Sequence, residues 1–129
     1  MERPLVLVVE DETLISLMLQ DGLEFAGFDV QTASNGEDAL RMLETFTYAA
    51  LATDLNLGRN SKLSGWDVAR RAREIAPGLA VIYTSGGFAA SDWAVQRVPN
   101  SVMVSKPFGT EQVVTAISQL LNIGSASAA

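Results

Sequence analysis

Polar residues that could bind a cation and a phosphoryl group follow four hydrophobic segments of the sequence, each at the point where the segment ends. In chain order they are Glu10 and Asp11, Asp54, Thr84 and Ser85, and Lys106. Carboxylates brought together repel one another by about 4 kcal/mol per pair at roughly 4 Å and an effective dielectric constant near 20, so they need a cation. A cation held by oxygen ligands is a hard divalent ion, for which Mg²⁺, Mn²⁺ and Ca²⁺ are all suited. Because Mg²⁺ commonly combines one or two carboxylates with a phosphate, the pattern predicts a phosphate partner.

Short apolar segments alternate with segments of helical periodicity, and this alternation positions the polar residues. The predicted strands are Leu5–Val9, Phe28–Thr32, Ala49–Thr53, Leu79–Thr84 and Ser101–Val104. Nearly continuous apolar strands separated by helices are typical of a parallel sheet covered by helices on both faces. The carboxyl ends of its strands lie at one edge, where ligands bind near the reversal of strand order. The sequence therefore predicts an α/β fold, a (βα)₅ doubly wound five-stranded parallel sheet.

The helices between these strands are predicted from apolar periodicity and from capping signals. One apolar face is formed in the first helix by Ile15, Met18, Leu19, Gly22, Leu23 and Ala26, and in the last by Val113, Val114, Ile117, Leu120 and Leu121. Capping boxes are predicted from Ser34 and Glu37 at the second helix and from Ser64 and Asp67 at the third. The fourth helix, Ala89–Val98, has the weakest signal, because two glycines precede it and a proline ends it.

The composition of the 129 residues is that of a globular protein, with 48% hydrophobic and 19% charged residues, and it excludes several kinds of site. A net charge of −6 argues against nucleic-acid binding. The absence of cysteine and histidine excludes disulfides, thiolate or imidazole metal sites and a histidine-dependent triad. The first apolar run has only five residues, too few for a signal peptide or a membrane span. We expect a cytoplasmic protein with one domain over residues 1–123 and a flexible tail over residues 124–129.

The order of the polar residues resembles the receiver domain of bacterial two-component response regulators. The resemblance rests on Glu10-Asp11, on Asp54 and Thr84 at the ends of the third and fourth strands, and on Lys106-Pro107-Phe108. It covers the chain from about Leu5 to Leu121 and implies a flavodoxin-like fold with strand order 2-1-3-4-5. The family often has two aspartates at the first site, and Glu10 is a frequent variant of one of them.

The resemblance also implies a role for each site residue. Asp54 is the phosphoacceptor, and Mg²⁺ is held by Glu10, Asp11, Asp54 and the backbone carbonyl of Asn56. The phosphoryl group is bound by Asn56, Thr84, Ser85 and Lys106, and Thr84 and Lys106 assist the transfer. The Lys106–Pro107 peptide is typically cis in the family. Because the chain has no histidine, the donor must be a histidine kinase, a histidine phosphotransfer protein or a small phosphodonor.

Three features depart from the pattern of the family. Met103 stands where the family has an aromatic switch residue that acts with Thr84. Tyr83 is next to Thr84 in the sequence, but its side chain is predicted on the other face of the strand. The loop over residues 55–64 is longer than usual, and its basic side chains are interpreted as a mobile flap near the phosphate. Residues 86–98 are predicted to be mobile and to become ordered on phosphorylation, since glycine eases backbone rearrangement.

The sequence thus predicts a single-domain response regulator, a phosphoacceptor rather than an enzyme, that signals through protein contacts as a monomer or weak dimer. Its output partner is expected on the face made by the fourth helix, the fifth strand and the fifth helix. A phosphate sink and a receiver excised from a hybrid kinase remain alternatives. Asn56 argues against an aspartate-nucleophile phosphatase, which needs a second acid there, and the missing glycine-rich loop argues against a nucleotide or flavin binder. Trp66, Tyr83 and Trp93 are interpreted as packing or surface aromatics.

Overall fold

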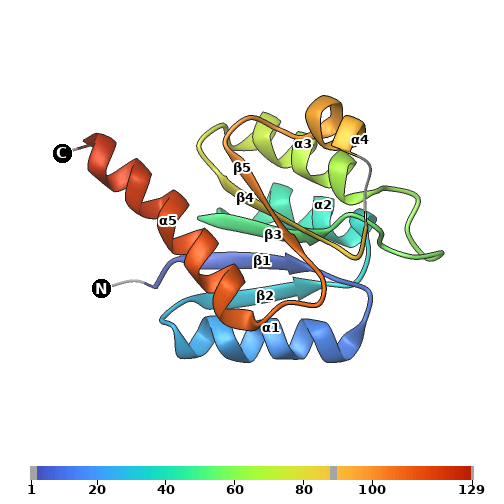
Figure 1. Ribbon diagram of the computed structural model, residues 1–129, viewed down its shortest axis with the longest axis horizontal. Helices are drawn as coiled ribbons and strands as arrows, with labels where there is room; N and C mark the ends of the chain where they lie inside the picture. The colour runs from blue at the N-terminus through green and yellow to red at the C-terminus, as the bar shows by residue number, and fades with distance from the viewer. Residues whose placement is uncertain (1–2, 88–89, 129) are drawn as a thin grey trace.

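The chain folds as a five-stranded parallel sheet with helices on both faces, in a computed structural model that describes residues 3–87 and 90–128 (Figure 1). The strands are β1 (Leu5–Val9), β2 (Asp29–Ala33), β3 (Ala50–Asp54), β4 (Ala80–Ser85) and β5 (Ser101–Ser105). The helices are α1 (Thr13–Phe25), α2 (Gly36–Thr45), α3 (Gly65–Ile75), α4 (Ala90–Gln96) and α5 (Thr110–Ala128). The strand order is β2-β1-β3-β4-β5, which confirms the predicted fold class and topology.

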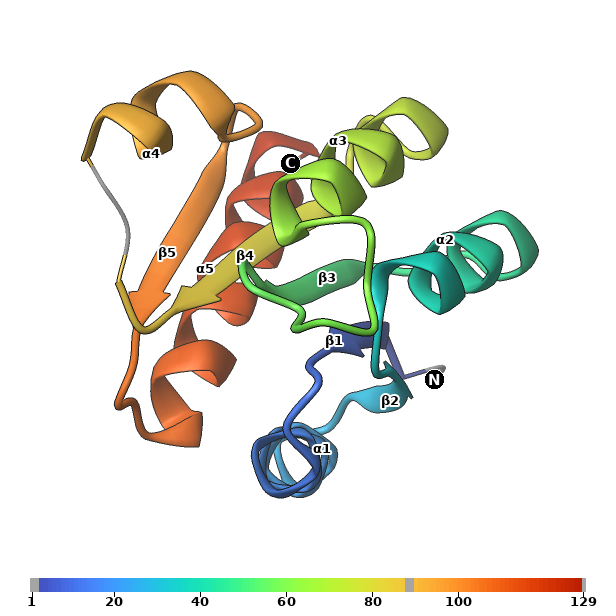
Figure 2. The same ribbon diagram turned by 90° about the vertical axis from the view of Figure 1, so that its right-hand side faces the viewer.

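The sheet reverses its strand order between β1 and β3, where the connections leave in opposite directions. Figure 2 shows α2 and α3 on one side of the sheet and α1 and α5 on the other. Helix α4 reaches α3 through Trp93, whose ring centroid lies 6.2 Å from that of Trp66. Val9 of β1 pairs with Thr53 of β3, and Asp54 pairs with Thr84 of β4. The carboxyl ends of the three central strands are therefore level at one edge, which is where such sheets bind ligands.

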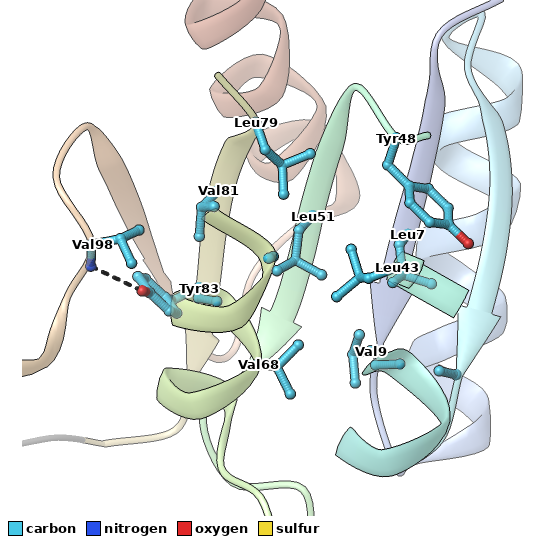
Figure 3. Packing of buried hydrophobic residues seen from close by; sticks show 14 of the residues in the cluster. Leu7, Val9, Leu43, Tyr48, Leu51, Val68, Leu79, Val81, Tyr83 and Val98 are labelled. Atoms are coloured by element: carbon cyan, nitrogen blue, oxygen red, sulfur yellow. Dashed lines mark hydrogen bonds between the residues drawn. The ribbon is translucent and has the colours of Figure 1, made fainter. Parts of the chain in front are cut away.

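The core consists of two layers, because successive side chains of each strand point to opposite faces of the sheet. Odd-numbered residues such as Leu7, Leu51 and Tyr83 pack beneath α2 and α3, and even-numbered ones such as Val8 and Ile82 pack against α1 and α5. Figure 3 shows the first layer, in which the Tyr83 hydroxyl accepts a hydrogen bond from the backbone N–H of Val98 at 3.2 Å. Burial of the strands on both faces holds their polar ends in fixed positions.

Four predicted strands end one residue later than expected. The strands β2, β3, β4 and β5 have as their last residues Ala33, Asp54, Ser85 and Ser105. The prediction followed the apolar runs, whereas the backbone ladder continues one residue further, as the pairing of Asp54 with Thr84 shows. Asp54 is thus held by the sheet itself and does not belong to the loop that follows.

One predicted capping box is wrong and the other is confirmed. Asn35, not Ser34, caps α2, since its side chain accepts a hydrogen bond from the backbone N–H of Asp38 at 2.8 Å. Both residues are good caps three positions before an acid, so the local pattern did not decide between them. At α3 the box of Ser64 and Asp67 is present in both directions.

The fourth helix is shorter than predicted. Helix α4 spans Ala90–Gln96, within the predicted range of Ala89–Val98, whose first residue lies outside the described part of the chain. Residues 124–128 continue α5, in keeping with the high helix propensity of alanine, and the flexibility expected for them stays a prediction. The boundary of the domain at residue 123 stays a prediction. Among the described residues, no helix is both long and apolar enough to cross a membrane.

Candidate functional site

Three carboxylates meet at the carboxyl edge of the sheet. Glu10 follows β1, Asp54 ends β3, and Asp11 begins the connection to α1; one carboxylate oxygen from each lies within 4.8 Å of the others. Glu10 and Asp54 are buried, whereas Asp11 is exposed. Buried charges are costly unless they are compensated, so the cluster needs positive charge beside it.

Lys106 supplies part of that charge from the end of β5. Its Nζ lies 2.7 Å from Oδ2 of Asp54 and 3.2 Å from Oε1 of Glu10. Burial lowers the pKa of Lys106, but its hydrogen bonds and charge interactions with the two acids outweigh this effect and raise the pKa above its usual value. The peptide bond between Lys106 and Pro107 is cis, as the resemblance to receiver domains implies.

One ammonium does not neutralise three carboxylates. Burial raises the pKa of Glu10 to about 7; a hydrogen bond from the backbone N–H of Glu12 opposes this rise, and the charge of Asp54 adds to it. A raised carboxyl pKa shows that the ionised form is under-compensated at this site. Carboxylate oxygens with an open, partly exposed side at Asp11 are the donor set that hard divalent cations prefer. The residues present therefore fit Mg²⁺.

The connection between β3 and α3 runs directly over the carboxylates. The backbone N–H of Asn56 donates to Oδ1 of Asp54 at 3.2 Å, and the Asn56 side chain accepts from the backbone N–H of Gly58 at 3.0 Å. Gly58 has a φ of 77°, and a Cβ there would lie 2.6 Å from Oδ2 of Asp11. The structure thus brings Asn56 to the acidic cluster, as predicted.

The two hydroxyl residues at the end of β4 have different surroundings. Thr84 is buried beside Asp54 in the ladder. The Ser85 hydroxyl accepts from the backbone N–H of Gly87 at 3.0 Å and lies 2.9 Å from that residue's carbonyl oxygen. Ser85 lines a cavity of about 490 Å³ together with Asp54 and Asn56. The pocket at Asp54 is therefore large enough for a phosphoryl group.

No described contact joins Met103 to the acidic cluster, and its predicted role as a switch residue with Thr84 is untested. Met103 lies on β5 opposite Tyr83 of β4 and packs, partly buried, against the core layer beneath α2 and α3. Tyr83 points to that same layer, which confirms the face predicted for it. The basic side chains of the long loop, Arg59 and Lys62, are exposed, and their predicted action as a flap is untested.

The sequence reasoning missed an aromatic cluster that reaches from the site to α4. Trp66 lines the cavity at Asp54, and its ring centroid lies 4.8 Å from that of Tyr83. Trp93 of α4 packs edge-on against Tyr83 at 5.8 Å and lies under the guanidinium of Arg97 at 4.1 Å. The position of Trp66 directly after Gly65, at the start of α3, was the one signal in the sequence that could have placed it near the site.

Comparisons with known proteins agree with this geometry. The sequence model described as "Response regulator receiver domain" matches residues 6–118. A response regulator receiver protein, CpdR of Brucella abortus, is 31% identical over 117 residues, which are 90% of this chain and 95% of that protein. The crystal structure of a response regulator receiver protein from Sinorhizobium medicae superposes with a TM-score of 0.86 at 39% identity, covering 94% of this chain and 96% of that one.

Longer proteins also match over part of their length. The probable transcriptional regulatory protein TcrX of Mycobacterium tuberculosis is 31% identical over 90% of this chain, but the match covers only 49% of TcrX. This chain likewise spans 28% of the transcriptional regulatory protein PhoP of Bacillus subtilis. The similarity to such regulators therefore concerns one of their parts.

Proposed function

The chain belongs to the response regulator receiver domain family, and on this premise we propose that Asp54 accepts a phosphoryl group from a phosphohistidine in a Mg²⁺-dependent reaction. The observation that carries the proposal is the shared contact of Lys106 with Asp54 and Glu10 inside a cluster of three carboxylates. The cluster of carboxylates can accept an anionic phosphoryl donor only when the negative charge of the carboxylates is compensated. Bound Mg²⁺ would supply this compensation and neutralise charge on the phosphoryl oxygens.

Each residue of the site has its own role in the proposed phosphoryl transfer. A carboxylate oxygen of Asp54 attacks phosphorus, the bond from phosphorus to the imidazole nitrogen breaks, and the imidazole leaves with the electron pair. The Lys106 ammonium can leave the acids to donate to a phosphoryl oxygen, and the Thr84 hydroxyl can donate to another. The backbone N–H of Asn56 already points to the Asp54 carboxylate. Groups fixed by the sheet before the reaction cost little reorganisation during it.

The magnesium ligands in this proposal are Glu10, Asp11, Asp54 and the backbone carbonyl of Asn56. The supporting facts are the mutual approach of the three carboxylates and the anchoring of Asn56 on Asp54. Ser85 contributes through its place in the cavity wall. An asparagine two positions after the nucleophile carries no acid for hydrolysis, so the domain is proposed as a phosphoacceptor and not as a phosphatase.

The phosphodonor protein is proposed to dock on α1. Leu14 and Phe25 are 82% and 96% exposed, and Leu17 and Met18 are also exposed. This apolar stripe adjoins a cavity of about 370 Å³ that is lined by Ile15, Met18, Lys106, Pro107 and Phe108. A donor that must bring phosphohistidine to Asp54 has to approach past Lys106, so a surface continuous with Lys106 suits it. Contiguous exposed apolar residues are a common mark of protein contact sites.

The output partner is proposed on the face formed by α4, β5 and α5. A cavity of about 530 Å³ lies along the edge strand β5 and α5, lined among others by Met103, Glu111, Gln112 and Gln119. The domain would act there in the cytoplasm, as a monomer or weak dimer, through a partner protein. The alternative of a phosphate sink needs no such partner.

Incubation with acetyl phosphate or phosphoramidate and Mg²⁺ tests the proposal directly. The protein should gain one phosphoryl group by intact mass, and base should remove it, because an acyl phosphate is acid-stable and base-labile. Asp54→Asn should gain none, whereas Asp38→Asn, an acid on α2 that pairs with Arg41, should be labelled as the wild type is. Equal labelling of Asp54→Asn and the wild type would overturn the assignment.

A further inference from the structure

The long connection between β3 and α3 is fastened to the start of α2 by two hydrogen bonds from backbone N–H groups. The backbone N–H of Lys62 donates to Oε1 of Glu37 at 2.6 Å, and the backbone N–H of Gly36 donates to Ser61 Oγ at 2.9 Å. The Ser61 hydroxyl, which has a single proton, lies 2.7 Å from the carbonyl oxygen of Leu63. We call residues 61–63 with Gly36 and Glu37 the loop anchor. It joins parts of the chain that are 25 positions apart.

The loop anchor is built into close packing and is not a chance surface contact. A Cβ on Gly36 would lie 2.7 Å from the Cβ of Leu63 and 3.1 Å from Ser61 Oγ, so only glycine fits there. Leu63 also packs, partly buried, against the core. The hydrogen bond from Lys62 is the main cause that lowers the pKa of the Glu37 carboxyl, so the ionised carboxylate is the form that accepts it.

The opposite end of the same loop lies on the acidic cluster. Asn56 donates to Asp54, Gly58 lies against the Asp11 carboxylate, and Leu57 between them is buried in the core. Only Gly58, Arg59 and Asn60 separate Leu57 from the loop anchor, and all three are exposed. The segment from Asn56 to Gly58 over the carboxylates is therefore held in its middle by the buried Leu57, and the chain that follows it is held by the loop anchor.

We propose that Glu37 and Ser61 are positioning residues for the phosphorylation site. By holding residues 61–63 on α2, they keep Asn56 and Gly58 against Asp54 and Asp11 and so set the affinity for Mg²⁺. The inference rests on the proposed function, because it assigns these residues to the magnesium site of that function. Glu37 and Ser61 contact neither Asp54 nor Asp11 by any described hydrogen bond, so they act through the loop.

The test measures Mg²⁺ binding itself, by calorimetry with MgCl₂ and no phosphodonor. Glu37→Ala and Ser61→Ala should each raise the Kd about tenfold, at the low end of the effect typical of outer partners of metal ligands. Ser61→Thr keeps the hydroxyl and should restore a Kd near that of the wild type. Glu44→Ala is the matched control, because Glu44 lies on the same helix and contacts Arg71 of α3 instead.

A purely structural role predicts a different result. It would lower the free energy of unfolding without changing the Kd of the folded protein, and unchanged Kd values in both alanine variants would overturn the inference. As a second readout, the amide protons of Asn56 and Gly58 should exchange faster in Glu37→Ala; unchanged exchange would contradict the positioning. The variant Asp11→Asn separates the two proposals. If Asp11→Asn also binds Mg²⁺ as the wild type does, the magnesium site of the proposed function is rejected. If Asp11→Asn loses Mg²⁺ binding while Glu37→Ala binds Mg²⁺ normally, only the role of the loop anchor is rejected.

Discussion

Lys106 Nζ lies 2.7 Å from Asp54 Oδ2 and 3.2 Å from Glu10 Oε1, so one ammonium group is shared by two carboxylates from different strands. The acid side chains are 7% and 1% exposed. Removing one member of a buried ion pair leaves an uncompensated charge, which is more destabilising than the pair is stabilising. The contact therefore joins the chemistry of the site to the stability of the fold.

Replacing the ammonium should make stability depend on magnesium. We expect Lys106→Met to lower the free energy of unfolding by about 1–3 kcal/mol in the absence of Mg²⁺, less than the full cost of a broken buried pair because Glu10 can take up a proton. Mg²⁺ should then restore more stability to the variant than it adds to the wild type, since it replaces the lost charge. Urea unfolding with and without MgCl₂ measures both quantities. An equal effect of Mg²⁺ on both proteins would contradict this role of Lys106.

A methyl group at Gly58 should disturb the cation site through Asp11. Gly58→Ala adds a Cβ that would lie 2.6 Å from Asp11 Oδ2. It also places alanine in the left-handed backbone conformation that Gly58 adopts, which costs about 1–2 kcal/mol. Gly27 is the matched control, because its φ of 104° is also positive but no atom would lie within 4 Å of a Cβ there.

Both glycine variants should lose similar stability in urea, but only Gly58→Ala should bind Mg²⁺ several-fold more weakly. Calorimetry with MgCl₂ on the two folded variants makes the comparison. If Gly27→Ala weakens binding to the same degree, the loss of affinity comes from backbone strain in general and not from the approach of Gly58 to Asp11.

The buried hydroxyl of Tyr83 should limit stability at alkaline pH. Burial raises the pKa of Tyr83 above its usual 10.0, while the hydrogen bond from Val98 N opposes this rise. The folded state thus favours the neutral phenol, so its stabilising contribution is complete below about pH 10 and is lost as the pH rises through the folded pKa. Tyr83→Phe should be less stable than the wild type at neutral pH by about 1 kcal/mol, the usual worth of one hydrogen bond.

The difference between the two proteins should shrink above about pH 10, because phenylalanine has no proton to lose. Urea midpoints measured from neutral to alkaline pH follow it. Tyr48, whose pKa is raised to about 12 by burial, stays in both proteins and cancels in the comparison. A constant difference across this pH range would show that Tyr83 does not titrate with unfolding.

The apolar stripe of α1 should serve protein donors and not small ones. Leu14→Ser and Phe25→Ser are expected to slow phosphotransfer from a phosphorylated histidine kinase or phosphotransfer protein about tenfold, since each removes an exposed apolar contact at a typical interface cost of about 1 kcal/mol or more. Labelling by acetyl phosphate should not change. Val95→Ser, at a 79% exposed position of α4, is the control for loss of surface hydrophobicity. Equal slowing by all three variants would reject α1 as the docking site.

The sequence predicted the sheet well because its strands are buried on both faces. Continuous apolar runs such as Leu5–Val9 have one plausible structure when helices separate them, and the order of acids, hydroxyls and lysine on their ends identified the edge that matters. The strand ends were one residue short at Asp54 and Ser85, because apolar content stops before the ladder does. The location of Asp54, Glu10 and Lys106 was accordingly predictable.

The parts that escaped prediction depend on contacts between distant segments. Asn35 and Ser34 offer the same local cap, and the fit of Gly36 against Leu63 is invisible without the fold. The stacking of Trp66 on Tyr83 likewise joins α3 to β4. The sequence predicted only that these aromatic residues are packing or surface residues. The packing of the two layers shows that Trp66 lines the Asp54 cavity.

Because β5 is an edge strand and comes last among the strands of the chain, the acidic cluster receives its ammonium group late in synthesis. Glu10 and Lys106 are separated by 96 positions, and β5 pairs only with β4. Glu10 and Asp54 precede Lys106 in the chain, so during synthesis both acids emerge before the strand that delivers the ammonium. A nascent or truncated polypeptide that stops before residue 106 therefore lacks the group that balances its acids.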